Sequence, residues 1–72
     1  MPKTYRQLES DLALAKRWYH GDRAGARRLS NAYSSLATWY ASCGSEGADF
    51  AATTYITLAV KYGKLAGAEV RV

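Results

Sequence analysis

Apolar residues recur at steps of three and four in three successive segments of this 72-residue chain. Steps of this size place side chains on one face of an α-helix, whereas a half-buried strand needs strict alternation. The three stripes comprise Tyr5, Leu8, Leu12, Ala15 and Tyr19; Leu29, Tyr33, Leu36, Tyr40 and Cys43; and Ala51, Tyr55, Leu58, Tyr62 and Leu65. The pattern predicts helices over about residues 4–20, 22–43 and 48–66, with a short extended tail over 67–72.

Residues that typically begin or end helices stand at the limits of these segments. Thr4, with Gln7 three positions later, has the form of a capping box. Gly21 occupies the place where a left-handed residue commonly ends a helix, and Asp22 after it is a good N-cap for the next one. Gly44 is expected to end the second helix in the same way.

The third segment is apolar over more than half of its circumference. Its polar strip consists only of Thr53, Thr57, Lys61 and Lys64. Either Ser45 or Asp49 is suited to cap it. The stretch TTYITLAV is rich in β-branched residues, which favours a strand, but the apolar run over 50–65 is too long for a typical strand. A helix that is apolar nearly all round is either central in the fold or pressed against another chain.

The expected fold is therefore all-α, with a single helical domain over residues 1–72. We expect a small three-helix array or bundle with short glycine-containing turns, whose third helix is central or lies at an oligomer interface. Trp18-Tyr19, Trp39-Tyr40 and Lys61-Tyr62 recur at spacings of 21 and 22 residues. This echo indicates either a decayed internal repeat or three helices that end in similar ways.

The chain has one cysteine, Cys43, so it cannot form an intrachain disulfide, and no Cys/His set has metal-ligand spacing. The stability of so small a domain then depends on helix packing or on association with another chain. A lone cysteine is typical of a reducing compartment, and residues 1–10 contain no apolar signal segment. The uncharged run over 29–45 is too polar to span a bilayer. We therefore expect a cytoplasmic protein without metal, cofactor or membrane contact.

His20 and Cys43 are the only pair suited to nucleophilic catalysis. A dyad needs contact near ~3 Å, but the predicted second helix separates the two residues by about 30 Å. The stretch GDRAGA, residues 21–26, resembles a general anion site at a helix N-terminus, yet it lacks the spacing of a phosphate-binding P-loop. We expect no enzymatic activity and no small-molecule substrate.

The net charge of +4 is concentrated in the first half of the chain. The candidate residues for binding phosphates or an acidic partner are Lys16, Arg17, Arg23, Arg27 and Arg28. The sequence lacks the small and apolar positions that a helix-turn-helix needs around its turn glycine, so no base-specific contact is predicted. Non-specific binding of nucleic-acid phosphates through this cluster is the alternative function.

Trp18 and Trp39 each lie about 100° from the main apolar stripe of their predicted helix. They either widen the core or form an exposed aromatic flank for a partner chain. The candidate partner-binding residues are Trp18, Trp39, Leu14 and Arg28. The favoured function is a non-enzymatic, self-associating protein-binding module, such as an accessory or inhibitory protein of the kind that phages and plasmids encode. Its partner would be another protein, or a second copy in a homodimer.

Overall fold

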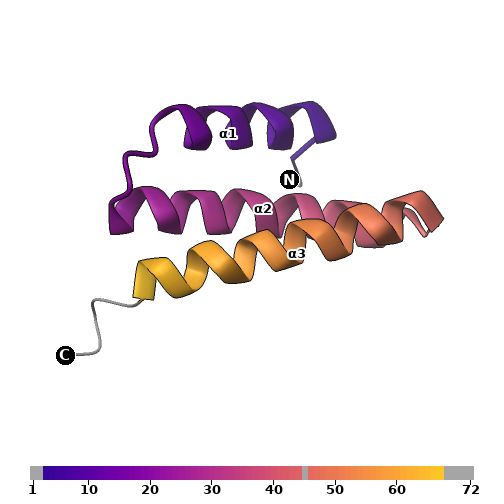
Figure 1. Cartoon of the computed structure of the whole chain (residues 1–72). Helices are drawn as coiled ribbons and strands as arrows, with labels where there is room; N and C mark the ends of the chain where they lie inside the picture. Colours follow the sequence, from indigo (N-terminus) through magenta and orange to yellow (C-terminus); the bar gives the residue numbers. More distant parts are fainter. Residues whose placement is uncertain (1–2, 45, 68–72) are drawn as a thin grey trace.

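Three α-helices make up the part of the chain that the computed structural model describes, residues 3–44 and 46–67 (Figure 1). The helices are α1 (Tyr5–Arg17), α2 (Arg23–Cys43) and α3 (Glu46–Gly67). No described residue lies in a strand, and TTYITLAV is helical throughout. The predicted all-α, three-helix fold is thus confirmed. The tail predicted from residue 67 begins inside α3, and its residues 68–72 lie outside the described part.

The central helix is α2, which has α1 on one side and α3 on the other (Figure 1). The prediction allowed α3 to be central, and this alternative is wrong. The reason lies in the side chains: α2 buries Leu29, Tyr33 and Leu36, whereas every buried residue of α3 is an alanine. Large apolar side chains stabilise by the area they remove from water, so the helix that carries them takes the middle position.

The predicted caps of α1 and α2 are present. The Oγ1 of Thr4 accepts a hydrogen bond from the Gln7 amide at 3.2 Å, and Oε1 of Gln7 accepts one from the Thr4 amide at 2.9 Å. The Asp22 carboxylate accepts from the Gly25 amide at 3.3 Å. Hydrogen bonds from the backbone amides of Asp22 and Gly25 lower the pKa of this carboxyl. Gly44 ends α2 in the left-handed conformation, with φ of 72°.

The C-terminal end of α1 differs from the prediction. The helix stops at Arg17, with Trp18 as its C-cap, instead of continuing to residue 20. Gly21 has the expected positive φ of 85°, but it lies within the connection to α2. Tyr19 leaves the helix and packs edge-on against Tyr62 of α3, with ring centroids 5.6 Å apart. The contact between Tyr19 and Tyr62 therefore outweighs the local sequence preference to continue α1 by one more turn.

At the other end of the molecule, α3 follows α2 after a very short connection. The helix begins at Glu46, so Asp49 lies in its first turn and is not its cap. The alternative cap, Ser45, lies outside the described residues. The short connection returns the chain along α2, so α2 and α3 run antiparallel (Figure 1).

The core contains the predicted stripes of α1 and α2. Its buried members are Leu8, Leu12, Ala15, Leu29, Tyr33, Leu36 and Ala59. From these two stripes only Cys43 is exposed, at the last residue of α2. Helical spacing of large apolar residues therefore predicted the packing of the first two helices.

The predicted stripe of α3 is confirmed in part: Tyr55, Leu58 and Tyr62 pack against the core, but the buried residues of this helix are its alanines. Leu65, expected in the core, is 47 % exposed. The hydroxyl of Ser30 on α2 donates a hydrogen bond to the backbone carbonyl of Ala59 at 2.8 Å. A Cβ atom on Gly63 would lie only 3.2 Å from the Ser30 Oγ. The two helix backbones approach closely because alanine and glycine line the contact.

All six tyrosines form one continuous ladder of ring contacts. The order is Tyr19, Tyr62, Tyr33, Tyr55, Tyr40 and Tyr5, with neighbouring ring centroids 5.6 to 5.8 Å apart. Each such pair contributes about 0.5–1.5 kcal/mol beyond the burial of its area. Tyr19, Tyr40 and Tyr62, which recur at spacings of 21 and 22 residues in the sequence, all belong to the ladder. Tyr19 lies outside the helices, whereas Tyr40 and Tyr62 lie within α2 and α3. The three tyrosines therefore share a role in packing, but they do not mark three helix ends of the same kind, because only two of them are helical.

The end of this ladder makes stability depend on pH in the alkaline range. The hydroxyls of Tyr5 and Tyr40 are 2.6 Å apart, and this hydrogen bond raises the pKa of Tyr5 well above its ordinary value of about 10. A raised pKa in the folded state contributes stability that is complete below pH ~10 and is lost above it. Thermal unfolding followed by circular dichroism should show a melting temperature that falls above pH ~10. The fall should be smaller in Tyr5→Phe, and an identical fall in both proteins would contradict this role.

Candidate partner-binding groove between α1 and α2

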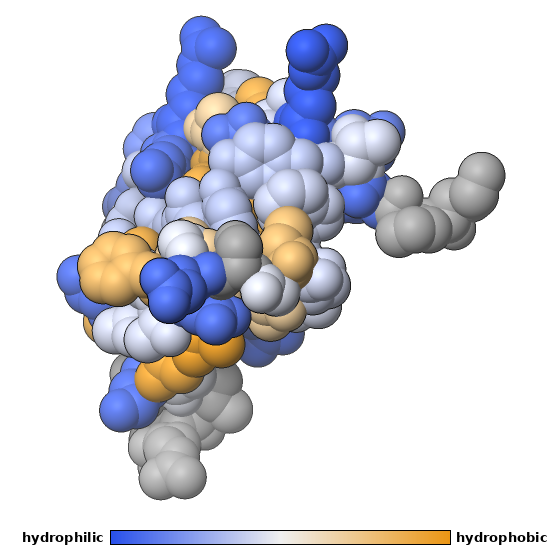
Figure 2. Space-filling model, turned by 90° about the vertical axis from the view of Figure 1, so that its right-hand side faces the viewer, coloured by the Kyte–Doolittle hydropathy of each residue, from blue (hydrophilic) through white to orange (hydrophobic). Residues whose placement is uncertain are grey.

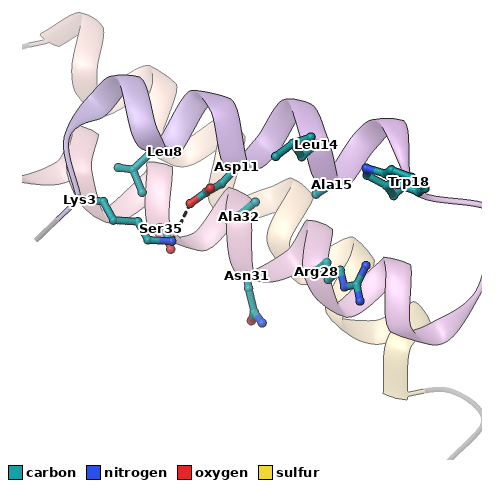
Figure 3. A pocket seen from close by; sticks show the side chains of 10 residues that line it. All are labelled: Lys3, Leu8, Asp11, Leu14, Ala15, Trp18, Arg28, Asn31, Ala32 and Ser35. Atoms are coloured by element: carbon teal, nitrogen blue, oxygen red, sulfur yellow. Dashed lines mark hydrogen bonds and ion pairs between the residues drawn. The ribbon is translucent and has the colours of Figure 1, made fainter.

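A shallow groove of about 300 Å³ runs between α1 and α2. The residues that line it from α1 and its flanking segments are Lys3, Leu8, Asp11, Leu14, Ala15 and Trp18, and those from α2 are Arg28, Asn31, Ala32 and Ser35. Figure 3 shows these side chains on the two neighbouring helices, with Asn31 pointing away from α1 and with α3 behind them. The groove therefore lies on the face of α2 that α3 leaves uncovered.

Two large apolar side chains at one end of the groove are exposed to solvent. Leu14, in the last turn of α1, is 53 % exposed, and Trp18, the C-cap of that helix, is 59 % exposed (Figure 3). Arg28 of α2 lines the same end of the groove. Three of the four predicted partner-binding residues thus come together, although the sequence places them on two different helices.

The fourth predicted partner-binding residue, Trp39, has a different environment. It is partly buried, with its ring centroid 4.6 Å from that of Tyr5 and 5.2 Å from that of Tyr40. One edge of Trp39 lines a second hollow that continues the groove toward the C-terminal end of α2. The two hollows share Lys3, Leu8 and Ser35. Trp39 therefore mainly packs the core, and Trp18 alone of the two tryptophans is a large exposed aromatic surface.

The far wall of this second hollow consists of short polar side chains that the sequence analysis did not single out. They are Ser34, Ser35, Thr38 and Ser42. The Thr38 hydroxyl donates to the Ser34 carbonyl at 3.0 Å, and the Ser42 hydroxyl donates to the Trp39 carbonyl at 2.7 Å. Hydroxyls bonded to their own helix compete less for water, which makes the wall less polar than its composition suggests. In the sequence, the uncharged but polar stretch over residues 29–45 was the feature that could have indicated this wall.

The charges in the groove are unevenly balanced. Lys3 and Asp11 form an ion pair at 2.6 Å across the end away from Trp18 (Figure 3). Both side chains are well exposed, so the pair is worth at most about 1 kcal/mol. Arg28 has no ion pair or side-chain hydrogen bond with any residue of 3–44 or 46–67. The end with Leu14 and Trp18 therefore presents an apolar surface next to a cation.

The five predicted phosphate-binding residues divide among different surroundings. Arg28 lines the groove, whereas Arg23 and Arg27 line a separate hollow with Ala66 near the C-terminal end of α3. The Lys16 ammonium lies 5.9 Å from the ring centroid of Tyr33. Arg23 and Arg27 therefore lie close to the C-terminal end of α3, apart from the groove.

Arg17, the fifth of these cations, is the last residue of α1 and is exposed. The five residues therefore lie at one end of the molecule, where Arg28 lines a different hollow from Arg23 and Arg27.

Among the described residues, the side chains with catalytic or metal-binding potential are dispersed. His20 precedes α2 and Cys43 ends it, so the length of the helix separates them. The Cys43 thiol donates a weak hydrogen bond to the Trp39 carbonyl at 3.5 Å. No group of three or more His, Cys, Asp or Glu side chains in the described ranges is arranged to hold a metal ion. None of the three helices is both long enough and apolar enough to cross a membrane.

The groove and the fold together define a small three-helix chain with an exposed aromatic and cationic surface beside its central helix. Comparison with protein-family models, with curated proteins and with solved structures finds no match for this chain. Its function is therefore inferred from the residues and the geometry above.

Proposed function

We propose that this protein is a non-enzymatic protein-binding module that uses the groove between α1 and α2. The observation that carries the proposal is the exposure of Leu14 and Trp18 beside the unpaired Arg28. Exposed Trp and Arg side chains are the residues most often responsible for binding energy at protein interfaces. An accessory or inhibitory role in the cytoplasm agrees with the absence of a catalytic set in the described residues and with the single, exposed cysteine.

The chemistry of the groove specifies the kind of partner. A shallow, open surface beside a helix accommodates side chains projecting from a helix or strand of another protein. Leu14 and Trp18 would contact an aliphatic or aromatic side chain, and Arg28 would pair with a carboxylate. The partner segment is therefore an acidic amphipathic one. The serine and threonine wall formed by Ser34, Ser35, Thr38 and Ser42 offers no charge that would repel it.

Binding of nucleic acid through the basic residues is the less favoured function. Arg28 lines a different hollow from Arg23 and Arg27, and Lys16 lies beside the Tyr33 ring, whereas strong non-specific binding needs many phosphate contacts at once.

The proposal predicts a large effect of Trp18→Ala on peptide binding. The probe is a fluorescein-labelled acidic amphipathic helix, and its anisotropy reports the Kd. We expect Trp18→Ala to raise the Kd by ~30-fold or more, as for an interface residue worth about 2 kcal/mol. Arg28→Gln should raise it by a smaller factor, which shrinks as salt is added.

The matched control is Phe50→Ala, because Phe50, at 78 %, is the most exposed large apolar side chain outside the groove among the described residues. This variant should bind the acidic peptide as the wild type does, and a charge-reversed basic peptide should bind neither protein. Equal weakening by Phe50→Ala, or failure of the acidic peptide to bind at millimolar concentration, would reject the proposal. Preferential binding of duplex DNA would favour the nucleic-acid function.

A further inference from the structure

On its outer side, α3 carries a second regularly spaced stripe, away from its buried alanines. Steps of four and three link the exposed residues Glu46, Phe50, Thr53, Thr57, Val60 and Lys64. These are the a and d steps of a coiled-coil heptad. At 100° per residue the stripe lies about 140° around the helix from the alanine face. Figure 2 shows hydrophobic side chains at the surface in the lower part of the molecule, where α3 lies.

The order of side chains along this stripe is such that the stripe is complementary to a second copy of itself running in the opposite direction. Glu46 and Lys64 lie at equal distances along the chain on either side of Tyr55, as do Phe50 and Val60. A second copy of α3 running antiparallel, with its twofold axis near Tyr55, therefore sets each acid against a base and each apolar residue against an apolar residue. At the middle, the small side chains of Thr53 and Thr57 meet. These pairs also join a positions to d positions, as antiparallel packing of two heptad stripes requires.

A hollow on this face has the form that such packing needs. It is about 460 Å³ in volume and is lined by Thr57, Val60, Lys61, Lys64 and Leu65. The first four are the i, i+3, i+4 and i+7 residues of a helix, which form the hole for one knob of a facing helix. At the same level on an antiparallel copy lies the partner's Phe50, which in the single chain is 78 % exposed.

The charges at the two ends of α3 have no ion-pair partner among the residues that the structure describes. Glu46, Asp49 and Lys64 form no ion pair with any residue in 3–44 or 46–67. The ends of the stripe are about 27 Å apart at 1.5 Å per residue, so its acids and bases cannot meet in one molecule. An antiparallel copy brings them together at both ends, and it also opposes the two helix dipoles favourably.

We infer that the outer face of α3 is a symmetric, antiparallel interface between two copies of this chain. The contact spans less than 30 Å of one helix, so the area is at the low end for specific interfaces and the dimer is a weak one. α3 packs on the side of α2 away from the groove, which leaves the groove free in the dimer (Figure 1). The inference is independent of the proposed function, because it uses different residues.

The test is sedimentation equilibrium from about 10 µM to 1 mM, a range suited to a weak interface. The wild type should dimerise within this range. Glu46→Lys and Lys64→Glu each place like charges in contact twice per dimer, and each should raise the dimer Kd by ~10-fold. The double variant exchanges the two charges and should restore the Kd to within ~3-fold of the wild type. Circular dichroism must show equal helicity in all variants.

Trp18→Ala is the matched control, since it alters the groove and leaves α3 intact; its dimer Kd should equal that of the wild type. A monomer at every concentration would overturn the inference, as would single variants that dimerise normally or a double variant that stays monomeric. A dimer lost in Trp18→Ala but kept in Glu46→Lys would place the interface in the groove instead. Peptide binding to the groove can succeed or fail in any of these cases, so the two proposals are tested separately.

Discussion

Leu36→Ala should lower the free energy of unfolding by about 2–5 kcal/mol. Leu36 is only 1 % exposed and lies on α2, the helix that both other helices contact. The substitution removes its transfer free energy and leaves a cavity in the core cluster to which Leu36 belongs. A domain of this size has little stability in reserve, so the variant should be largely unfolded at 37 °C. Urea unfolding followed by circular dichroism measures the change.

The control for this prediction is Leu65→Ala, which makes the same chemical change in α3. Leu65 is 47 % exposed, so its truncation should cost less than about 1 kcal/mol. Similar losses in the two variants would mean that α2 is not the centre of the core. That result would also favour the alternative in which α3 is the central helix of the fold.

Gly25→Ala should destabilise the protein, although alanine normally favours a helix over glycine by about 1 kcal/mol. A Cβ atom at this position would lie 2.7 Å from an Asp22 carboxylate oxygen and 2.8 Å from Cδ1 of Tyr19. Either the cap of α2 or the ring that contacts Tyr62 must move. Loss of the cap costs about 0.5–2 kcal/mol, and overpacking costs about 1–3 kcal/mol, so the expected net loss is about 1–3 kcal/mol.

The matched variant is Gly47→Ala, in the first turn of α3. A Cβ atom there meets nothing within 4 Å, so this change should stabilise the protein by a few tenths to about 1 kcal/mol. Opposite signs for the two glycines in thermal unfolding would support the close contact around Gly25. Stabilisation by both substitutions would show that the connection between α1 and α2 is not held by Asp22 and Tyr19.

The fold of α1 and α2 could be predicted from the sequence because two independent signals agreed. Periodic large apolar residues marked the buried faces, and Thr4, Asp22 and Gly44 marked the ends. The prediction was wrong for the end of α1, because the conformation of Tyr19 is set by its ring contact with Tyr62, a residue far away in the sequence. No local pattern contains that contact.

The buried face of α3 was predicted only in part, for a different reason. Tyr55, Leu58 and Tyr62 of the predicted stripe do pack against the core. A stripe drawn through large residues included Leu65, whereas the helix buries Ala48, Ala52, Ala59 and Ala66. Sequence patterns give weight to size, but two helices that approach closely need small residues between them. The alanines and Gly63 were the available signal for this contact.

The candidate site was only partly predictable. Trp18 and Trp39 occupy similar positions relative to their stripes, so the sequence could not tell which was exposed. The structure separates them because Tyr5 packs against Trp39, while no ring contact covers Trp18, which is 59 % exposed. Likewise, Arg27 and Arg28 are neighbours in sequence but line different hollows, because adjacent residues on a helix point about 100° apart.

The most direct test of the proposed function is a nuclear magnetic resonance titration of the ¹⁵N-labelled protein with the acidic amphipathic peptide. We expect shift changes at Leu14, at the indole N–H of Trp18 and at Arg28, with smaller ones along the serine and threonine wall of α2. The outer face of α3 around Phe50 should remain unchanged. Shifts confined to α3, or to Arg23 and Arg27 without Trp18, would contradict the groove as the partner-binding surface.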